Sequence, residues 1–221
     1  MPQDISSMER NVIQMKIVLA SASPRRRELL EQIGIPFEVV TSHVEERISS
    51  DRPEEVVEEL SCQKAEAVME ELTCSHSFCT ELNGMPKEDI LVIGADTVVA
   101  LDGAILGKPG DSAEAGAMLE RLQGREHEVY TGVTLFYRAA GAPEWTRKCF
   151  HERSKVRFFP MIKAEISEYV NTGDPMDKAG AYGIQGFCAR YISGIEGDYN
   201  NVVGLPAGRL YQEIKNLLRK P

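Results

Sequence analysis

The stretch ILVIGADTVVALDGAILGKP, residues 90–109, contains two apolar runs joined by a Leu-Asp-Gly turn. A continuous apolar run of this length is typical of a strand that is buried on both faces, and a short turn between two such runs is typical of a hairpin. We therefore expect a central strand followed by a hairpin. A hairpin makes its two strands antiparallel, so the sheet that contains it cannot be wholly parallel.

The segments on both sides of this stretch alternate between strand and helix patterns. Strands are expected at 16–20, 37–40, 127–137, 145–159 and 188–196, and helices at 24–33, 53–72, 112–123, 163–171 and 206–220. Alternation of this kind, interrupted by hairpins, predicts an α/β protein with a mixed β-sheet flanked by helices.

A chain of 221 residues with 43% hydrophobic residues can build one domain with a sizeable core. We expect residues 1–15 to form an N-terminal extension and residues 16–221 to form a single domain. The polar segment 73–89, TCSHSFCTELNGMPKED, contains Asn-Gly and a proline and is expected to be a surface insertion.

The formal net charge of −9 argues against binding to nucleic acid or to an anionic membrane, which requires a basic face. The sequence contains no run of 18 apolar residues, and residues 1–15 lack the apolar core of a signal peptide. Its five cysteines are widely spread and follow no disulfide-framework spacing. These features predict a cytoplasmic protein.

Three consecutive arginines, Arg25 to Arg27, stand where the first strand is expected to give way to a helix. Backbone N–H groups at a helix start favour an anion, and arginine donors match phosphate oxygens. Ser21 can donate as well. The alternative is a solvated first turn with surface ion pairs, and the residues alone leave both interpretations open.

Asp96, Lys64 and Lys108 are charged residues in apolar or constrained surroundings. Asp96 is expected at or near the end of the central strand, where ligand sites of α/β sheets gather, although a strand-end turn would also explain it. Lys64 falls within the apolar stripe of helix 53–72, so it either extends past the core into solvent or points into a cleft. Lys108 lies between Gly107 and Pro109, which by itself indicates little.

The segment 171–186, NTGDPMDKAGAYGIQG, is rich in glycine and polar residues, which is typical of a binding loop but also of a long structural loop. Gln185 within it could offer both a donor and an acceptor to a nucleobase. His127, at the start of an expected strand, is interpreted as structural.

Seven motifs in order resemble the Maf family, the septum-formation-protein homologues. They are SASPRR, VEE, GADTVV, LGKP, GREHEVYTGV, GDPMDKAGAYGIQG and GDYNNVVGLP, and the resemblance covers roughly residues 16–218. The N-terminal extension and the 73–89 segment depart from the family pattern without removing a motif residue.

The resemblance implies a two-lobed fold around a central cleft, related to the inosine-triphosphatase type. It implies a nucleoside triphosphate pyrophosphatase that releases the monophosphate and pyrophosphate, with Mg²⁺ as the cofactor and Mn²⁺ or Co²⁺ as substitutes. It also implies a homodimer. Such an enzyme would have a house-cleaning role, in which it hydrolyses ordinary or modified pyrimidine nucleotides. The resemblance also implies a link to the arrest of cell division.

The same resemblance assigns roles to individual residues. Asp96 is implied as the general base, and Glu46 as its partner around the metal. The implied phosphate-binding residues are Ser21, Arg25, Arg26, Lys64 and Lys108. Arg26, Thr97 and Gln185 match the three specificity positions of the branch that acts on dTTP and UTP.

Two other functions remain open from the sequence. One is a regulator of septum formation or cell division that binds nucleotide without significant turnover. The other is a nucleic-acid binder that uses the arginine cluster, against which the acidic balance argues.

Overall fold

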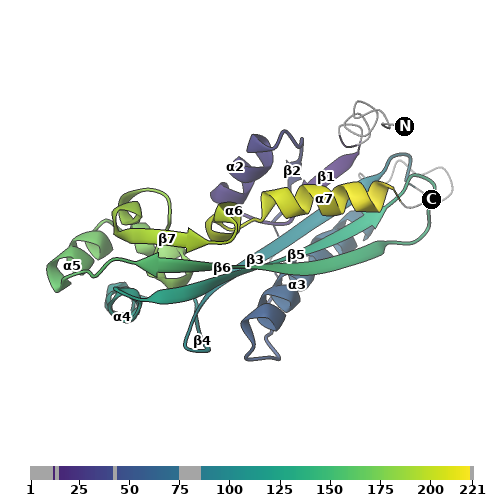
Figure 1. Ribbon diagram of the computed structural model, residues 1–221. Coiled ribbons are helices and arrows are strands. Elements are labelled where there is room, and N and C mark those ends of the chain that lie inside the picture. The colour runs from purple at the N-terminus through teal and green to yellow at the C-terminus, as the bar shows by residue number, and fades with distance from the viewer. Residues whose placement is uncertain (1–11, 13–14, 42–43, 75–85, 220–221) are drawn as a thin grey trace.

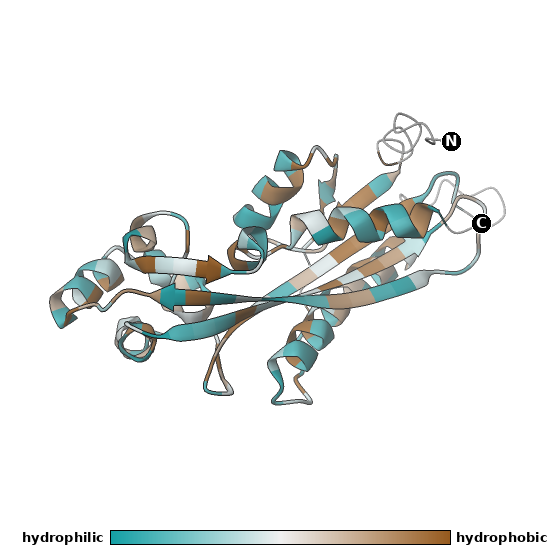
Figure 2. Cartoon of the chain, in the orientation of Figure 1, coloured by the Kyte–Doolittle hydropathy of each residue, from teal (hydrophilic) through white to brown (hydrophobic). Residues whose placement is uncertain are grey.

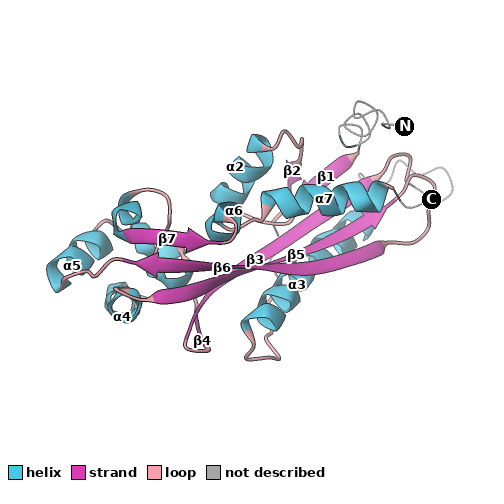
Figure 3. Ribbon diagram, in the orientation of Figure 1, coloured by secondary structure: helices cyan, strands magenta, loops and turns pink. Residues whose placement is uncertain are grey.

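The computed structural model describes residues 12, 15–41, 44–74 and 86–219. Its core is one seven-stranded sheet with the order β2-β1-β3-β5-β6-β7, and β4 pairs with β3 (Figure 3). β1 is parallel to β2 and β3, and the remaining pairs are antiparallel. The strands are β1 (Lys16–Leu19), β2 (Glu38–Val39), β3 (Ile90–Leu101), β4 (Ala104–Leu106), β5 (Glu126–Arg138), β6 (Thr146–Phe158) and β7 (Ile192–Glu196). The prediction of a mixed α/β sheet flanked by helices is confirmed.

Helices cover both faces of this sheet. The α-helices are α2 (Pro24–Gln32), α3 (Pro53–Cys74), α4 (Ser112–Leu122), α5 (Lys163–Asn171), α6 (Tyr199–Val203) and α7 (Ala207–Leu218). Figure 1 shows α3 on one face and α2, α6 and α7 on the other. α3 and α7 carry both hydrophobic and hydrophilic residues, as expected of helices that bury only one side (Figure 2). Among the described helices, none has both the length and the apolarity that crossing a membrane requires.

The alternation of side chains along β3 divides the hydrophobic core. Leu91 and Ile93 pack with α2 and α7, whereas Val92 packs against α3 on the opposite face. Further along, Val99 and Leu101 belong to a second cluster formed with α4 and α5. The face that carries α2 and α7 thus holds two separate core clusters, in agreement with the expected two-lobed arrangement.

One edge of β3 is open in the middle of the strand. Residues 90–93 pair with β1 and residues 99–101 pair with β4, both on the same side of β3. Residues 94–98 between them pair only with β5. Asp96 and Thr97 therefore lie on a stretch of strand whose second edge is unpaired. The expectation that Asp96 lies at or near a strand end is wrong, because β4 extends the sheet and β3 continues to Leu101.

α3 approaches the sheet very closely at two glycines. A Cβ atom on Gly94 would lie 2.3 Å from the carbonyl oxygen of Ser61, and one on Gly132 would lie 2.2 Å from the carbonyl oxygen of Val57. Only glycine allows this contact, so the height of α3 above β3 and β5 is set by backbone against backbone.

The predicted elements are present with shifts of a few residues at their ends, and α6 and three short 3₁₀ segments between 174 and 191 were not predicted. α3 extends to Cys74, so the first two residues of the expected 73–89 insertion are helical. Residues 75–85 of that segment, and all of the expected N-terminal extension except Val12 and Met15, lie outside the described residues. Val12 and Met15 are buried in the first core cluster.

Candidate functional site

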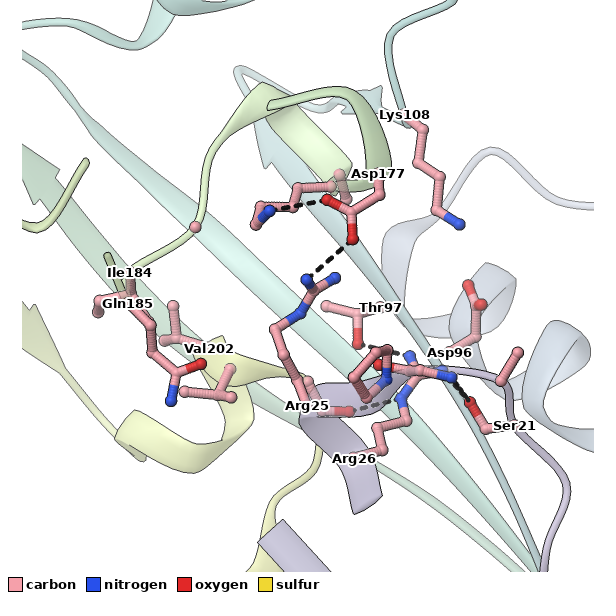
Figure 4. A pocket seen from close by; sticks show the side chains of 18 of the residues that line it. Ser21, Arg25, Arg26, Asp96, Thr97, Lys108, Asp177, Ile184, Gln185 and Val202 are labelled. Atoms are coloured by element: carbon pink, nitrogen blue, oxygen red, sulfur yellow. Dashed lines mark hydrogen bonds and ion pairs between the residues drawn. The ribbon is translucent and has the colours of Figure 1, made fainter. Parts of the chain in front are cut away.

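A cavity of about 690 Å³ opens at the unpaired edge of β3 (Figure 4). This volume lies within the range of small-molecule sites. Eight residues singled out from the sequence line the cavity together: Ser21, Arg25, Arg26, Lys64, Asp96, Thr97, Lys108 and Gln185. The structure therefore brings together residues from α2, α3, β3 and three loops.

Asp96 and Thr97 point to opposite faces of β3, yet both line the cavity because the strand edge between them is open. Asp96 faces α3, and its carboxylate contacts the ammonium group of Lys64. Lys64 is thus directed into the cavity rather than outward past the core. Its Nζ atom also lies 2.9 Å from Oε1 of Glu46, so the two predicted metal ligands meet at one cationic group.

The pair formed by Glu46 and Asp96 fits a divalent cation. Both carboxylates already surround a positive charge, and Mg²⁺ is commonly held by one or two carboxylates together with substrate phosphates and water. Within the described residues, no group of three or more histidine, cysteine, aspartate or glutamate side chains could hold a metal by itself. The donor set matches a cation that binds together with a phosphate ligand.

Arg26 is held by three side-chain hydrogen bonds. Its Nε donates to the carbonyl oxygen of Gly204 at 2.9 Å, Nη1 donates to Ser21 Oγ at 3.1 Å, and Nη2 donates to Thr97 Oγ1 at 3.1 Å. Burial lowers the pKa of Arg26, while the nearby charge of Asp96 acts in the opposite direction. A guanidinium group has five N–H donors, so two remain for a ligand.

The hydroxyl group of Ser21 is arranged to donate. Its oxygen accepts from Arg26 Nη1 and, at 3.3 Å, from the backbone N–H of Ser23. These two bonds occupy both lone pairs, so the hydroxyl hydrogen is left for an acceptor in the cavity. Ser23 is the N-cap residue of α2, but its side chain makes no capping hydrogen bond.

Arg25 is engaged by an acidic residue that was not singled out as a site residue. Its Nη1 lies 3.0 Å from Oδ2 of Asp177, and Lys178 Nζ lies 2.7 Å from the other oxygen of that carboxylate. Burial opposes ionisation of Asp177, but hydrogen bonds from Lys178 and Arg25 outweigh it and hold the pKa of Asp177 below its usual value. Asp177 belongs to the Gly-rich segment 171–186, whose composition was the only signal for it.

Gln185 and Lys108 lie on opposite sides of the cavity, with Arg25 and Thr97 between them (Figure 4). Gln185 has apolar neighbours in the lining, Ile184 and Val202, whereas Lys108 is exposed on the opposite side. The cavity thus has a cationic part and a more apolar part. Arg27, the third arginine of the cluster, is not part of the lining.

His127 supports the wall of the cavity from within the core. Its Nε2 lies 2.7 Å from the hydroxyl oxygen of Tyr182, a lining residue, and its ring stacks on Phe158. Burial lowers the pKa of His127 to about 4, so the ring is neutral at pH 7. This agrees with the structural role expected from the sequence.

Comparison with known proteins adds independent information. The family model described as Maf-like protein matches residues 16–217. The chain is 53% identical over 203 residues to the "dTTP/UTP pyrophosphatase" of Agathobacter rectalis, which covers 91% of this chain and 97% of that protein. It is 48% identical to the protein of the same name from Carboxydothermus hydrogenoformans, over 91% of this chain and 98% of that protein.

A solved structure from Mycobacterium abscessus, titled as a nucleoside-triphosphatase or dITP/XTP pyrophosphatase, shows a weaker likeness. It is 16% identical with a TM-score of 0.40, over 93% of this chain and 100% of that one.

Proposed function

The chain belongs to the Maf family, and from this premise we propose that it hydrolyses dTTP and UTP to the nucleoside monophosphate and pyrophosphate. The observation that carries the proposal is the meeting of Arg25, Arg26, Lys64 and Lys108 with Asp96 in one cavity of an acidic protein. A nucleoside triphosphate carries about four negative charges near neutral pH, and these four side chains bring positive charge to the cavity that would receive it.

The proposed reaction is attack of water on the α-phosphorus. Asp96 accepts the proton of the attacking water, and Lys64 holds the Asp96 carboxylate in place through their direct contact. The hydroxyl hydrogen of Ser21 and the two unused donors of Arg26 are available for phosphate oxygens. Pyrophosphate then leaves while the remaining arginine and lysine side chains bind its oxygens. Electrostatic positioning of the phosphates therefore supplies most of the rate acceleration.

Glu46 and Asp96 are the residues that would hold a divalent cation. When bound, such a cation supplies positive charge that offsets the charge on the phosphate oxygens. Lys64 contacts both carboxylates and keeps one of its three N–H donors for a phosphate oxygen.

The specificity of the proposed enzyme follows from Arg26, Thr97 and Gln185. The side-chain amide of Gln185 offers two N–H donors, and the Watson–Crick edge of thymine or uracil offers two carbonyl oxygens that can accept. Gln185 lies in the more apolar part of the cavity, where a base would bury its ring.

The test is a panel of nucleoside triphosphates with Mg²⁺, scored for pyrophosphate release, with an EDTA-treated sample in parallel. We expect dTTP and UTP to be the best substrates and EDTA to abolish turnover. Nucleotide binding without pyrophosphate release would instead support a regulator of cell division. Binding to nucleic acid that weakens as the salt concentration rises would support a nucleic-acid binder.

A further inference from the structure

A chain of hydrogen bonds leads from the cavity into the core of the protein. Arg26 Nη2 donates to Thr97 Oγ1, which lies 2.9 Å from Oγ1 of Thr131 on the neighbouring strand β5. Thr131 Oγ1 in turn donates to the carbonyl oxygen of Asn201 in α6 at 3.0 Å. Thr131 and Asn201 are completely buried, whereas Thr97 lines the cavity.

The number of hydroxyl hydrogens available determines which group donates in each of these hydrogen bonds. A carbonyl oxygen can only accept, so the single hydroxyl hydrogen of Thr131 is used on Asn201. The hydrogen between the two threonines must then come from Thr97, because two hydroxyl oxygens at 2.9 Å need one hydrogen between them. Thr97 has no hydrogen left for a ligand. One lone pair of Thr97 Oγ1 accepts a hydrogen bond from Arg26 Nη2, and the other can accept one from a ligand in the cavity.

The hydroxyl groups of Ser21 and Thr97, both bonded to Arg26, therefore offer a ligand opposite hydrogen-bonding roles. Ser21 is left with a hydrogen to donate, as phosphate oxygens require, and Thr97 is left with a lone pair. Thr97 shares its face of β3 with Val99, another residue of the cavity lining. Thr97 lies between Lys108 and Gln185, the residue with apolar neighbours (Figure 4).

We propose that Thr131 is a specificity-determining positioning residue, which makes Thr97 an obligatory acceptor for the N3–H of a uracil-type base and so excludes cytosine. Thymine and uracil carry a hydrogen on N3, whereas cytosine carries a lone pair there. Two lone pairs facing each other lose a hydrogen bond and leave buried acceptors unsatisfied. The inference rests on the proposed function, because it deepens the substrate choice of the same site.

The test compares kcat/KM for dTTP and dCTP in the wild type, in Thr131→Val and in Thr131→Ser. Valine keeps the shape of threonine but frees the Thr97 hydroxyl hydrogen, whereas serine keeps the hydroxyl and loses only a methyl group. We expect Thr131→Val to reduce the preference for dTTP at least ~10-fold, on the scale of an unsatisfied buried polar group, and Thr131→Ser to retain it. An unchanged preference in Thr131→Val, or an equal loss in Thr131→Ser, would overturn the proposal.

A second measurement needs no variant. The wild type is assayed with dTTP methylated at N3, which lacks the hydrogen that Thr97 accepts. We expect kcat/KM to fall at least ~10-fold relative to dTTP. Equal turnover of the methylated nucleotide would refute the role of Thr97 as an acceptor. Failure of the wild type to hydrolyse dTTP at all would refute the proposed function instead, so the two outcomes are distinct.

Discussion

The ammonium group of Lys64 contacts the carboxylate of Asp96 across 32 positions of sequence, from α3 to the unpaired stretch of β3. Asp96→Asn keeps the size of the side chain and an oxygen that can accept from Lys64, but removes the proton acceptor. We expect the variant to fold normally and to lose at least ~100-fold in turnover, the usual scale for a general base. Pyrophosphate release and a thermal unfolding curve measure the two properties.

Asp102→Asn is the matched control for that variant. Asp102 is an exposed carboxylate with φ of 53° that is paired with Arg125 and is not part of the cavity lining. Asparagine accepts such a backbone conformation, so turnover should be unchanged. Full activity of Asp96→Asn would remove Asp96 from the mechanism.

Arg25 is paired with Asp177, so this carboxylate competes with phosphate oxygens for the same guanidinium group. The pair is partly exposed, with the Asp177 side chain 60% accessible, and such pairs contribute at most about 1 kcal/mol. Asp177→Asn should therefore lower KM for dTTP by up to ~5-fold with little change in kcat. A higher KM in this variant would show that Asp177 supports nucleotide binding rather than competing with it.

The close contact of α3 with the sheet predicts a strong effect of a single methyl group. Gly94→Ala places a Cβ atom against the backbone of Ser61, so α3 must shift together with Lys64. We expect a loss of about 1–3 kcal/mol in the free energy of unfolding, together with reduced turnover. Denaturant unfolding and the pyrophosphate assay measure both effects.

Gly116→Ala serves as the control for this substitution. Gly116 lies within α4, and a Cβ atom there meets nothing within 4 Å. Alanine should stabilise this helix by about 0.5–1 kcal/mol and leave turnover unchanged. If the two variants behaved alike, the packing of α3 on Gly94 would have no special importance.

The buried His127 is expected to lower the free energy of unfolding as the pH falls. Its pKa is about 4 in the folded protein against 6.5 for the free side chain, because burial disfavours the charged form. Between these values the unfolded chain binds a proton that the folded chain does not, so stability falls as the pH drops from 6.5 and levels off below 4. The full effect is at most about 3 kcal/mol.

The measurement is the free energy of unfolding from pH 7 to pH 4 for the wild type and for His127→Gln. Glutamine can still bond to the Tyr182 hydroxyl group but does not titrate in this range. The difference between the two curves should therefore shrink toward low pH. Parallel curves would mean that His127 titrates normally in the folded protein.

Periodicity and turn residues were sufficient to predict most of the elements, since buried strands and amphipathic helices leave strong local patterns. The orientation of Lys64 could not be predicted in this way. Its position on the helix fits both a solvent-directed side chain and one in a cleft, and the open edge of β3 decides between them. The open edge exists because β1 and β4 pair with separate parts of β3, and such pairing between distant segments cannot be seen in a local sequence pattern.

Two further features were missed for related reasons. α6 has only five residues, although the side chain of Asp198 caps it by accepting from the backbone N–H of Asn200, a signal that the sequence does contain. Thr131 looks like any β-branched residue of a buried strand. Its significance comes from a carbonyl group 70 positions away, which no pattern within a strand indicates.

The ladder between β3 and β5 continues from Ile90 opposite Arg138 to Ala100 opposite Glu128, beneath both core clusters and the cavity between them. A hinge that swung the two halves together would have to bend or break this shared ladder. Side chains at the rim of the cavity, such as Arg25, and the segment around Asp177 can adjust to an incoming nucleotide without disturbing this ladder.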